Sequence, residues 1–546
     1  MKKIALLLAV SLVNVTIAQD VERELPAEWR GIVEGGRFQD RFLPLVDGKL
    51  SSDVWGAKEV IPRYVDNGIE DDVISYWGGN IIEDGGKYHL YVCGWLENSA
   101  KGHMAWMKSA IFHTVADNIY GPYTTMDIVN LGHNPEIYRA KNGSYVLSAH
   151  MQWKPYIAVS KKIEGPWNYQ PLECNMRDRT LIEGLSNLSF ASREDGSVVM
   201  VCRGGGIWIS RDGISDFEQV TTESVYPKRE GRFEDPVIWR DNVQYHLIVN
   251  DWLGRIAYYL RSKDGVKWVE DVGEAYTPGI ARHKSGHVED WYKFERIKVF
   301  QDKERRAVLA NFAVCDTIKK QDLSNDNHSS KNIIIPLNKG LLIDICNETI
   351  QPKMKSISVK IKAEEGFNPA KQLDVSSLRF GLNADINFGR GCKVKSTEVS
   401  GDDLIVTFDT KGYTIPDSEF APKLLGRDRD GAMVYGYARN PNVDFQPAML
   451  SAVKPVQEGD KIVVEVTNYG FKSSEVATMK LTLPDGRSYE AQVDPIDSYQ
   501  SRKVTFGIAK LPPSGEATIE IRSKSNSTVG YTEKIEIDKP KPGKKG

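Results

Sequence analysis

Hydrophobic residues in the first 315 positions fall into short alternating runs, which predict β-strands joined by tight turns. One unit occurs five times: a polar residue, an apolar strand, a turn rich in Asp, Gly, Asn or Lys, and a second apolar strand. The copies begin at Asn80, Asn134, Asn187, Glu234 and Glu295, in steps of 54, 53, 47 and 61 residues. A period of about 50 residues built from hairpins is typical of β-propeller blades. The pattern therefore predicts an all-β protein with a five-bladed β-propeller.

The opening of each copy is the place to look for function. In a propeller, the innermost strands all begin at one end of a central channel. The polar residue that opens each copy is therefore expected to face a pocket shared by all five blades.

Two further regions of short alternating strands follow the propeller. Residues 339–450 predict a β-sandwich module, and residues 451–538 predict a second, immunoglobulin-like β-sandwich. The propeller is assigned to residues 19–338 and is expected to be the catalytic domain. The Lys/Pro/Gly-rich tail, residues 539–546, is expected to be disordered.

The first 18 residues have the pattern of a signal peptide. Lys2 and Lys3 precede an apolar run that ends near Val13, and Ala18 offers a small residue for cleavage. This predicts a secreted or periplasmic protein. No later run reaches 18 apolar residues, so membrane insertion is not expected. The formal net charge of −3 gives no reason to expect nucleic acid as a partner, and the sequence makes no prediction of the oligomeric state.

Six cysteines are scattered through the chain without a Cys-x-x-Cys spacing. The sequence therefore predicts neither a disulfide framework nor a metal site. Cys93, Cys202 and Cys315 each lie near the end of a second strand, where a free cysteine behaves as a small buried hydrophobe. No cofactor is predicted. A structural calcium ion in the channel is compatible with the sequence, although no motif predicts it.

All twelve tryptophans and all nine histidines lie before residue 329. Indole and imidazole groups are the usual materials of sugar platforms and proton-transfer sites. This distribution places the chemistry in the propeller and leaves the later modules as scaffolding.

Glu234 and Asp235 are the strongest catalytic candidates. Adjacent strand residues point to opposite faces, so one of the two should enter the channel while the other holds the structure. The alternative for Asp235 is a turn cap before Pro236. Glu295 is either a pocket acid with Arg296 as its charge partner or half of a structural ion pair, and the sequence leaves both interpretations open.

Several other residues at blade ends are assigned to substrate binding, because amide, imidazole, guanidinium and indole groups recognise sugars. They are His133, Asn134, Glu136, Asn187, Arg203, Trp77, Trp95, Trp252 and Arg296. The arginines among them favour an anionic sugar, sulfated or uronic, because a guanidinium group binds planar anions through two hydrogen bonds.

Four blade openings carry a resemblance to known proteins: His133-Asn-Pro-Glu-Ile, Ser186-Asn-Leu-Ser, Glu234-Asp-Pro-Val-Ile-Trp and Phe294-Glu-Arg. Over residues 70–315 the chain resembles five-bladed glycoside hydrolases related to families 43 and 117. It looks most like secreted bacterial members of polysaccharide-utilisation systems.

The two families imply different catalytic groups. The family-43 pattern implies three carboxylates from the first three blades, but Asn134 and Asn187 stand where two of them would be. The family-117 pattern implies a histidine acid shortly before a glutamate in the fifth blade, here His287 before Glu295, and an aspartate base from the first blade, here Asp72. The alternatives are that His287 bonds a backbone carbonyl and that Asp72 is solvated surface.

These observations together predict a secreted glycoside hydrolase that removes terminal sugars from plant or algal oligosaccharides, with inversion of configuration. Inversion is expected because carboxylates placed across a channel leave room for a water molecule. One alternative is a polysaccharide lyase using His287, Tyr292 and Arg296. The other is a glycan-binding propeller without catalysis, which the amides of Asn134 and Asn187 favour.

Overall fold

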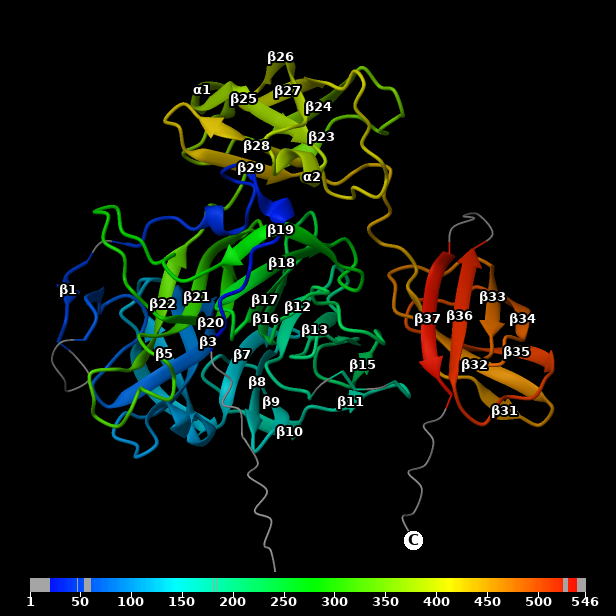
Figure 1. Ribbon diagram of the computed structural model, residues 1–546, viewed down its shortest axis with the longest axis horizontal. Helices are drawn as coiled ribbons and strands as arrows, with labels where there is room; N and C mark the ends of the chain where they lie inside the picture. Colours follow the sequence, from blue (N-terminus) through cyan, green and yellow to red (C-terminus); the bar gives the residue numbers. More distant parts are fainter. Residues whose placement is uncertain are drawn as a thin grey trace, which may run out of the picture.

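The computed structural model describes residues 20–46, 48–53, 60–179, 181–182, 184–523 and 529–537. The predicted signal peptide and the predicted disordered tail lie outside these ranges. The described chain contains far more β-strand than helix, which confirms the all-β prediction. It has three parts: a ring of five sheets, a seven-stranded sheet above it, and a pair of sheets at its side (Figure 1).

Each of the five ring sheets is an antiparallel meander, with one short parallel strand added to the third. Sheet 1 contains β3 (Ile74–Asp84), β4 (Lys87–Leu96), β5 (Ala110–Ala116) and β6 (Thr124–Leu131). Sheet 2 contains β7 (His133–Arg139), β8 (Tyr145–Met151), β9 (Lys154–Ser160) and β10 (Asn168–Pro171). Sheet 3 contains β12 (Ser189–Ser192), β13 (Val198–Val201), β14 (Ile207–Ser210), β15 (Phe217–Gln219) and the parallel β11 (Cys174–Asn175).

The last two sheets complete the ring. Sheet 4 contains β16 (Phe233–Arg240), β17 (Tyr245–Asp251), β18 (Ile256–Ser262) and β19 (Val269–Tyr276). Sheet 5 contains β20 (Lys293–Gln301), β21 (Ala307–Cys315) and β22 (Ser330–Pro336). The first strands contact one another in the cyclic order β3, β7, β12, β16, β20 and back to β3. The five first strands therefore surround one axis.

Separate hydrophobic cores lie between neighbouring sheets of the ring. The largest contains Trp239 of sheet 4 and Phe312 of sheet 5, and another contains Leu90 of sheet 1 and Ile334 of sheet 5. Similar cores join sheets 1 and 2, sheets 2 and 3, and sheets 3 and 4. The apolar side chains are buried between neighbouring sheets. The ends of the first strands can therefore carry polar residues.

The short elements lie mostly before the ring and within sheet 1. They are the two-stranded sheet of β1 (Leu50–Ser51) and β2 (Arg63–Tyr64), and the 3-10 turns at Ala27–Trp29, Gln39–Arg41 and Gly102–Lys108. The segment that precedes the ring runs between the ring and the seven-stranded sheet, where Arg41 donates a 2.8 Å hydrogen bond to the Tyr437 hydroxyl. In the described part of the chain, no helix is long and apolar enough to cross a membrane.

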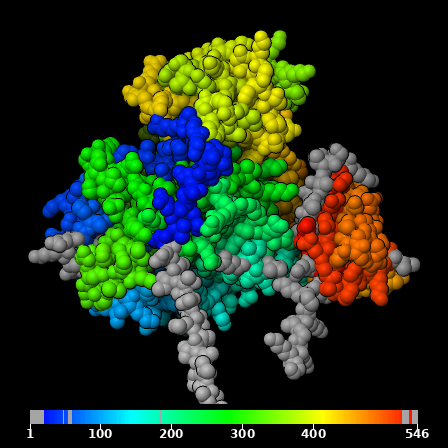
Figure 2. Space-filling model, in the orientation of Figure 1, coloured from blue at the N-terminus to red at the C-terminus, as the bar shows by residue number. Residues whose placement is uncertain are grey.

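The seven-stranded sheet follows the ring. In spatial order it contains β23 (Ile343–Ile345), β24 (Ser356–Ile361), β27 (Asp403–Asp409), β26 (Cys392–Ser400), β25 (Leu373–Gly381), β28 (Lys423–Asp428) and β29 (Met433–Tyr437). Two one-turn helices, α1 (Pro369–Gln372) and α2 (Asn383–Ile386), flank β25. The space-filling view shows this yellow region seated on the blue segment that precedes the ring and on the green part of the ring (Figure 2).

Two four-stranded sheets at the end of the chain share one hydrophobic core. One contains β30 (Leu450–Ala452), β32 (Lys461–Asn468), β31 (Val456–Glu458) and β35 (Ser501–Ile508). The other contains β34 (Ser488–Val493), β33 (Ala477–Thr482), β36 (Glu516–Ser523) and β37 (Val529–Glu536). Arg177 and Arg193 of the ring hydrogen-bond Ser451 and Tyr469 of this part.

Candidate active site at the mouth of the ring

Every ring sheet opens on a residue in the left-handed backbone region. These residues are Gly78 (φ 66°), Asn134 (55°), Asn187 (49°), Asp235 (53°) and Arg296 (54°). In four sheets the strand register shifts at the same point, as in a β-bulge. Glycine, asparagine and aspartate tolerate this conformation best, whereas it is strained for an arginine. The left-handed residues and the bulges therefore turn the opening side chains of sheets 2 to 5 toward the axis of the ring.

The opening side chains bond one another around the axis. Asn134 donates to Asn187 at 2.6 Å, and Asn187 donates to Glu234 at 2.8 Å. Arg296 donates to Asp235 at 2.9 Å, as a buried ion pair. Sheets 2 to 5 thus contribute to one polar cluster, which we call the mouth. Asp235 is an ion-pair partner here, and no turn-capping bond of its side chain is recorded among the described residues.

The bulges also change which residues of each copy reach the mouth. In sheet 1 the residue equivalent to Asn134 is Gly78, two positions before the predicted opening at Asn80. Asn80 instead bonds the backbone of Ile137, joining sheets 1 and 2. At sheet 4 the bulge breaks strand alternation, so Glu234 and Asp235 both reach neighbouring sheets.

A second group of polar residues lies buried between the first strands, next to the mouth. Glu136 forms a buried ion pair with Lys298 and accepts hydrogen bonds from the Ser189 hydroxyl and the Phe190 amide. Lys298 also donates to the carbonyl oxygen of Leu188 at 3.4 Å. Glu136, which was predicted to bind substrate, thus has a buried carboxylate that protein groups occupy.

Glu234 is the mouth carboxyl group with access to solvent. Its side chain is 24% exposed, and one oxygen lies 3.7 Å from the Arg203 guanidinium. Burial and the neighbouring Asp235 raise the pKa of Glu234 to about 7, against the opposing effects of Arg203 and Lys319. A carboxyl group in this state retains a proton near neutral pH, as a general acid requires.

Glu295 lies on the other side of the mouth and faces a cation. Lys319, from the loop between β21 and β22, forms an ion pair with it. The same ammonium group lies 4.7 Å from the centre of the Trp77 ring. Burial alone would lower the pKa of Lys319, but Glu295 and Glu234 raise it. Glu295 is thus ion-paired with a lysine, whereas Glu234 has a raised pKa.

Several buried polar atoms at the mouth have no hydrogen-bond partner within the described residues. They are Nε and Nη2 of Arg296, Oε1 of Glu295, Nε1 of Trp252, and both side-chain atoms of Asn250. Asn250 pairs with Glu234 across β16 and β17. Buried polar groups are normally satisfied, so a cluster of unsatisfied donors and acceptors is the signature expected of a site completed by a ligand.

His133 brings an aromatic shelf to the mouth. Its ring packs edge-on against Trp106 and Trp153 and stacks with His150. Burial, together with His150 and Arg296, lowers the pKa of His133 to about 3, so the imidazole is neutral. Trp153 is 59% exposed and offers a free indole face for a sugar ring.

Two predicted catalytic residues lie away from this cluster. Asp72 is exposed and forms no recorded hydrogen bond or ion pair with the mouth residues. His287 lies 3.1 Å from the Pro62 carbonyl oxygen, which is the structural role named as its alternative. Among the described residues, neither side chain is joined to the mouth by a hydrogen bond or ion pair, and the roles that the family-117 pattern implied for them stay predictions.

The predicted tryptophan platforms are also revised. Trp77 and Trp95 are buried and pack against His103, so neither presents an open face to a sugar. Trp252 is half-buried at the end of β17 and remains beside the mouth. Sequence reasoning missed Lys319, Asn250 and Trp106. Lys319 comes from a polar loop with no repeat signal, whereas Asn250 could have been found from its position opposite Glu234.

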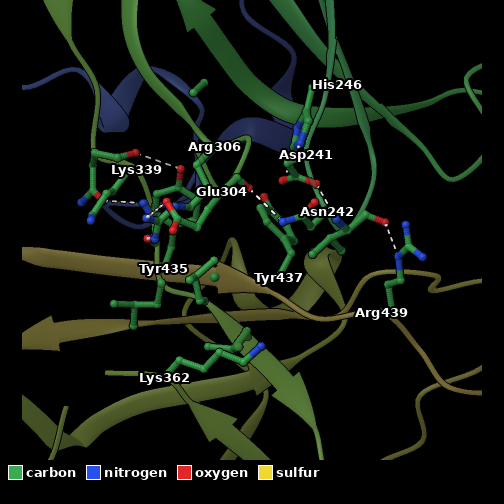
Figure 3. Close-up of a pocket in the computed structure, with 18 of the residues that line it drawn as sticks. Asp241, Asn242, His246, Glu304, Arg306, Lys339, Lys362, Tyr435, Tyr437 and Arg439 are labelled. Atoms are coloured by element: carbon green, nitrogen blue, oxygen red, sulfur yellow. Dashed lines mark hydrogen bonds and ion pairs between the residues drawn. The ribbon is translucent and has the colours of Figure 1, made fainter. Parts of the chain in front are cut away.

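A cavity of about 650 Å³ lies at the opposite end of the ring, against the seven-stranded sheet (Figure 3). Its polar groups have protein partners: Arg306 pairs with Glu364 and Asp302, Asp241 with His246, and Arg41 donates to the Tyr437 hydroxyl. No buried side-chain nitrogen or oxygen of its described lining lacks a hydrogen-bond partner. The cavity is therefore a satisfied interface between two parts of the protein, and the mouth is the better candidate for chemistry.

Comparisons with known proteins were made by sequence and by structure. No family model matches the chain, and no curated protein is similar in sequence. The structure resembles a family 117 glycoside hydrolase of the marine bacterium Zobellia galactanivorans, with 13% identity, a TM-score of 0.37, and coverage of 49% of this chain and 84% of that one.

Two family-43 structures match at a similar level. For the GH43_1 enzyme of Xanthomonas citri complexed with xylose, the identity is 10%, the TM-score 0.33, and the coverage 49% and 88%. For a thermostable family-43 glycoside hydrolase the values are 12%, 0.32, 54% and 94%. Both families indicated by the blade openings are thus among the matches, which confirms that resemblance. Because these TM-scores are below 0.5, the similarities are not evidence for function.

Proposed function

We propose that this protein is a glycoside hydrolase whose active site is the mouth of the ring, with Glu234 as general acid and Glu295 as the catalytic carboxylate. One observation carries the proposal: Glu234, with a pKa raised to about 7, shares the mouth with Glu295, which faces Lys319. Glycoside hydrolysis needs two carboxyl groups in opposite protonation states. Asp235 and Arg296 are positioning residues that hold the two glutamate-bearing strands in register.

The reaction follows from these roles. Glu234 gives its proton to the leaving glycosidic oxygen, and Glu295 removes a proton from the water that attacks the sugar carbon. The C–O bond to the leaving group breaks as the bond to water forms, and the configuration inverts. Asn250 and the two unpartnered Arg296 nitrogens supply hydrogen bonds to sugar oxygens. Release of terminal sugars belongs to the same proposal, because the buried ion pair of Glu136 and Lys298 occupies the space between the first strands next to the mouth.

The finer features of the proposal are the substrate and the architecture. The guanidinium groups of Arg203 and Arg296 favour a sulfated or uronic sugar from plant or algal oligosaccharides. The ring is proposed to be a five-bladed β-propeller, followed by two β-sandwich modules. Export by the predicted signal peptide, to the periplasm or the medium, belongs to the same proposal.

The experiment is a chromatographic screen of the purified mature protein against sulfated, uronic and neutral oligosaccharides. Glu234→Gln is expected to lower kcat about 10²- to 10⁴-fold, because the amide cannot donate the proton. The matched control is Glu364→Gln at the far cavity, which changes the same carboxyl group to the same amide away from the mouth. Unchanged turnover in Glu234→Gln, or an equal loss in the control, would contradict the assignment.

A glycan-binding protein without turnover is the second candidate. The observation that favours it is the chain of amides from Asn134 to Asn187, at positions where catalytic sites of this kind carry carboxylates. Binding of one sugar, seen as a shift in melting temperature, together with no product on any substrate would support it. A lyase is less well supported, because Tyr292 donates to Asp20 and burial raises the pKa of its hydroxyl.

A further inference from the structure

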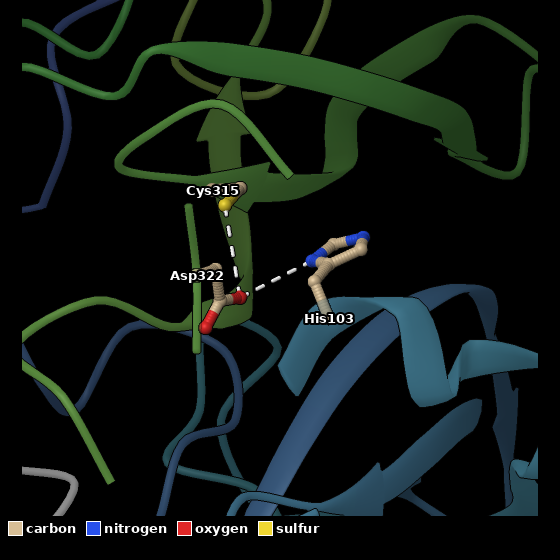
Figure 4. A group of neighbouring side chains, drawn as sticks. All are labelled: His103, Cys315 and Asp322. Carbon is tan, nitrogen blue, oxygen red and sulfur yellow. Dashed lines mark hydrogen bonds and ion pairs between the residues drawn. The ribbon is translucent and has the colours of Figure 1, made fainter. Parts of the chain in front are cut away.

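Three side chains that can bind metals meet beside the mouth, from segments far apart in the sequence (Figure 4). His103 lies on the 3-10 turn after β4, Cys315 ends β21, and Asp322 lies on the loop between β21 and β22. All three are buried, at 2% exposure or less. Nδ1 of His103 is 3.2 Å from Oδ2 of Asp322, and Sγ of Cys315 is 4.0 Å from the same oxygen.

The backbone holds two of these segments in contact. The His103 amide donates a 3.0 Å hydrogen bond to the Asp322 carbonyl oxygen. Gly102 has a φ of 53°, and a Cβ there would lie 2.0 Å from that oxygen, so only glycine permits the approach. The His103 ring is also held edge-on between Trp77 and Trp95. The imidazole and the carboxylate are therefore positioned before any ligand binds.

The separations of the three donor atoms lie close to those of a tetrahedral metal site. Zinc bonds of about 2.0–2.3 Å place neighbouring ligand atoms roughly 3.3–3.8 Å apart. The three donor atoms here all lie within 4.8 Å of one another, so small side-chain movements bring them into range. At 4.0 Å, the thiol makes at best a weak hydrogen bond to the carboxylate.

Within the described residues, His103 is the sole ion-pair partner of Asp322. A divalent cation bound between them would place positive charge directly beside this buried carboxyl group.

We propose that His103 Nδ1, Cys315 Sγ and Asp322 Oδ2 bind a divalent cation of the zinc class, with water in the fourth position. Imidazole, thiolate and carboxylate are the ligand set that zinc selects, whereas calcium and magnesium prefer oxygen ligands alone. Binding replaces the thiol proton of Cys315 with the metal and releases that proton to solvent.

The site also has a consequence for the mouth. Asp322 and Lys319 lie three residues apart on one loop, and Lys319 is the residue that pairs with Glu295. A cation bound between this loop and sheet 1 fixes the loop in place. The metal is thus a structural clip that holds Lys319 over the mouth and takes no part in the chemistry.

The test uses the full mature chain, prepared without a metal-affinity tag and stripped with a chelator. Zinc is titrated back and counted by mass spectrometry, and cobalt(II) is added to a second sample as a spectroscopic probe. We expect one zinc ion per chain, a rise in melting temperature, and a thiolate-to-cobalt charge-transfer band. Calcium and magnesium should produce neither effect. No substrate is involved, so the result is independent of the proposed hydrolase.

Two cysteine variants identify the site. Cys315→Ser is expected to lose the cobalt band and the stoichiometric zinc. Cys202→Ser, at a buried cysteine just after the second strand of sheet 3, should retain both. Less than one zinc per chain in the wild type, or an unchanged band in Cys315→Ser, would overturn the proposal. If Cys315→Ser does not fold, the cobalt band of the wild-type protein decides alone, because the band requires a thiolate ligand and its absence rejects the site.

Discussion

The two ends of the ring are both rich in charge, but they differ in how that charge is satisfied. At the far cavity Arg306 forms ion pairs with Glu364 and Asp302. Burial alone would raise the pKa of Glu364, but Arg306 and Lys339 outweigh burial and lower this pKa. At the mouth, Arg296 keeps two nitrogens without a partner and the pKa of Glu234 is raised. Buried polar atoms without a hydrogen-bond partner are therefore a better guide to a ligand-binding site than the presence of a cavity.

The largest expected difference between the two ends is in stability after loss of one carboxylate. Asp235→Ala leaves the Arg296 guanidinium buried with no recorded carboxylate partner among the described residues, which should cost about 3–5 kcal/mol. Glu364→Ala leaves Arg306 with Asp302 at 2.8 Å and should cost less, about 1–3 kcal/mol. Denaturant unfolding of both variants measures this. An equal or smaller loss for Asp235→Ala would break the comparison.

A second difference is the direction of the pH dependence. The pKa of Glu234 is raised from 4.5 to about 7, so the folded state binds its proton more tightly than the unfolded state does. Its contribution to stability is fully present below pH 4.5 and is lost as pH rises through about 7. The lowered pKa of Glu364 acts oppositely: its contribution is present above pH 4.5 and is lost as pH falls below that value.

Melting temperatures between pH 3 and pH 8 test these signs. Glu234→Gln should make the melting temperature decline less steeply between pH 5 and pH 8. The decline should not vanish, because Glu97 and Asp322 also have raised pKa values and contribute in the same direction. Glu364→Gln should flatten the acid side instead. An unchanged alkaline slope in Glu234→Gln would show that its carboxyl group is not perturbed.

The smallest expected effect is at the rim of the far cavity. Lys362 pairs with Asp344 at 2.6 Å, but these side chains are 43% and 60% exposed. Lys362→Ala should therefore change the free energy of unfolding by less than about 1 kcal/mol and leave turnover intact. Lys319→Ala is the contrasting variant, because it removes the cation that faces Glu295 and should lower turnover. Similar turnover in the two variants would contradict a special role for Lys319.

Part of the site could be read from the chain. The five-fold repeat located the blade openings, and Asn134, Asn187, Glu234, Asp235, Glu295 and Arg296 all lie at or beside the mouth. The residue types at the openings also indicate the backbone conformation, because asparagine and aspartate tolerate the left-handed conformation that the bulges require. The repeat could not show that bulging would shift the opening of sheet 1 to Gly78.

Other predicted residues meet partners that are distant in sequence. Glu136 is a suitable pocket acid by position, but Lys298, 162 residues later, occupies its carboxylate. His287 follows the family-117 pattern, but the chain places the Pro62 carbonyl oxygen beside it. Scattered cysteines predicted no metal site, yet ring closure places Asp322 against His103, 219 residues away.

Strand alternation and turn chemistry act over a few neighbouring residues. The strands, the five-fold repeat and the residue types at each opening could therefore be predicted from the sequence. Only the folded structure shows which polar side chains at the openings have hydrogen-bond or ion-pair partners. It brought Lys319 to Glu295, assembled His103, Cys315 and Asp322, and paired the charges of the far cavity. The physical reason is that protonation, ion pairing and metal binding depend on distances of a few ångströms between groups that only the closed ring brings together.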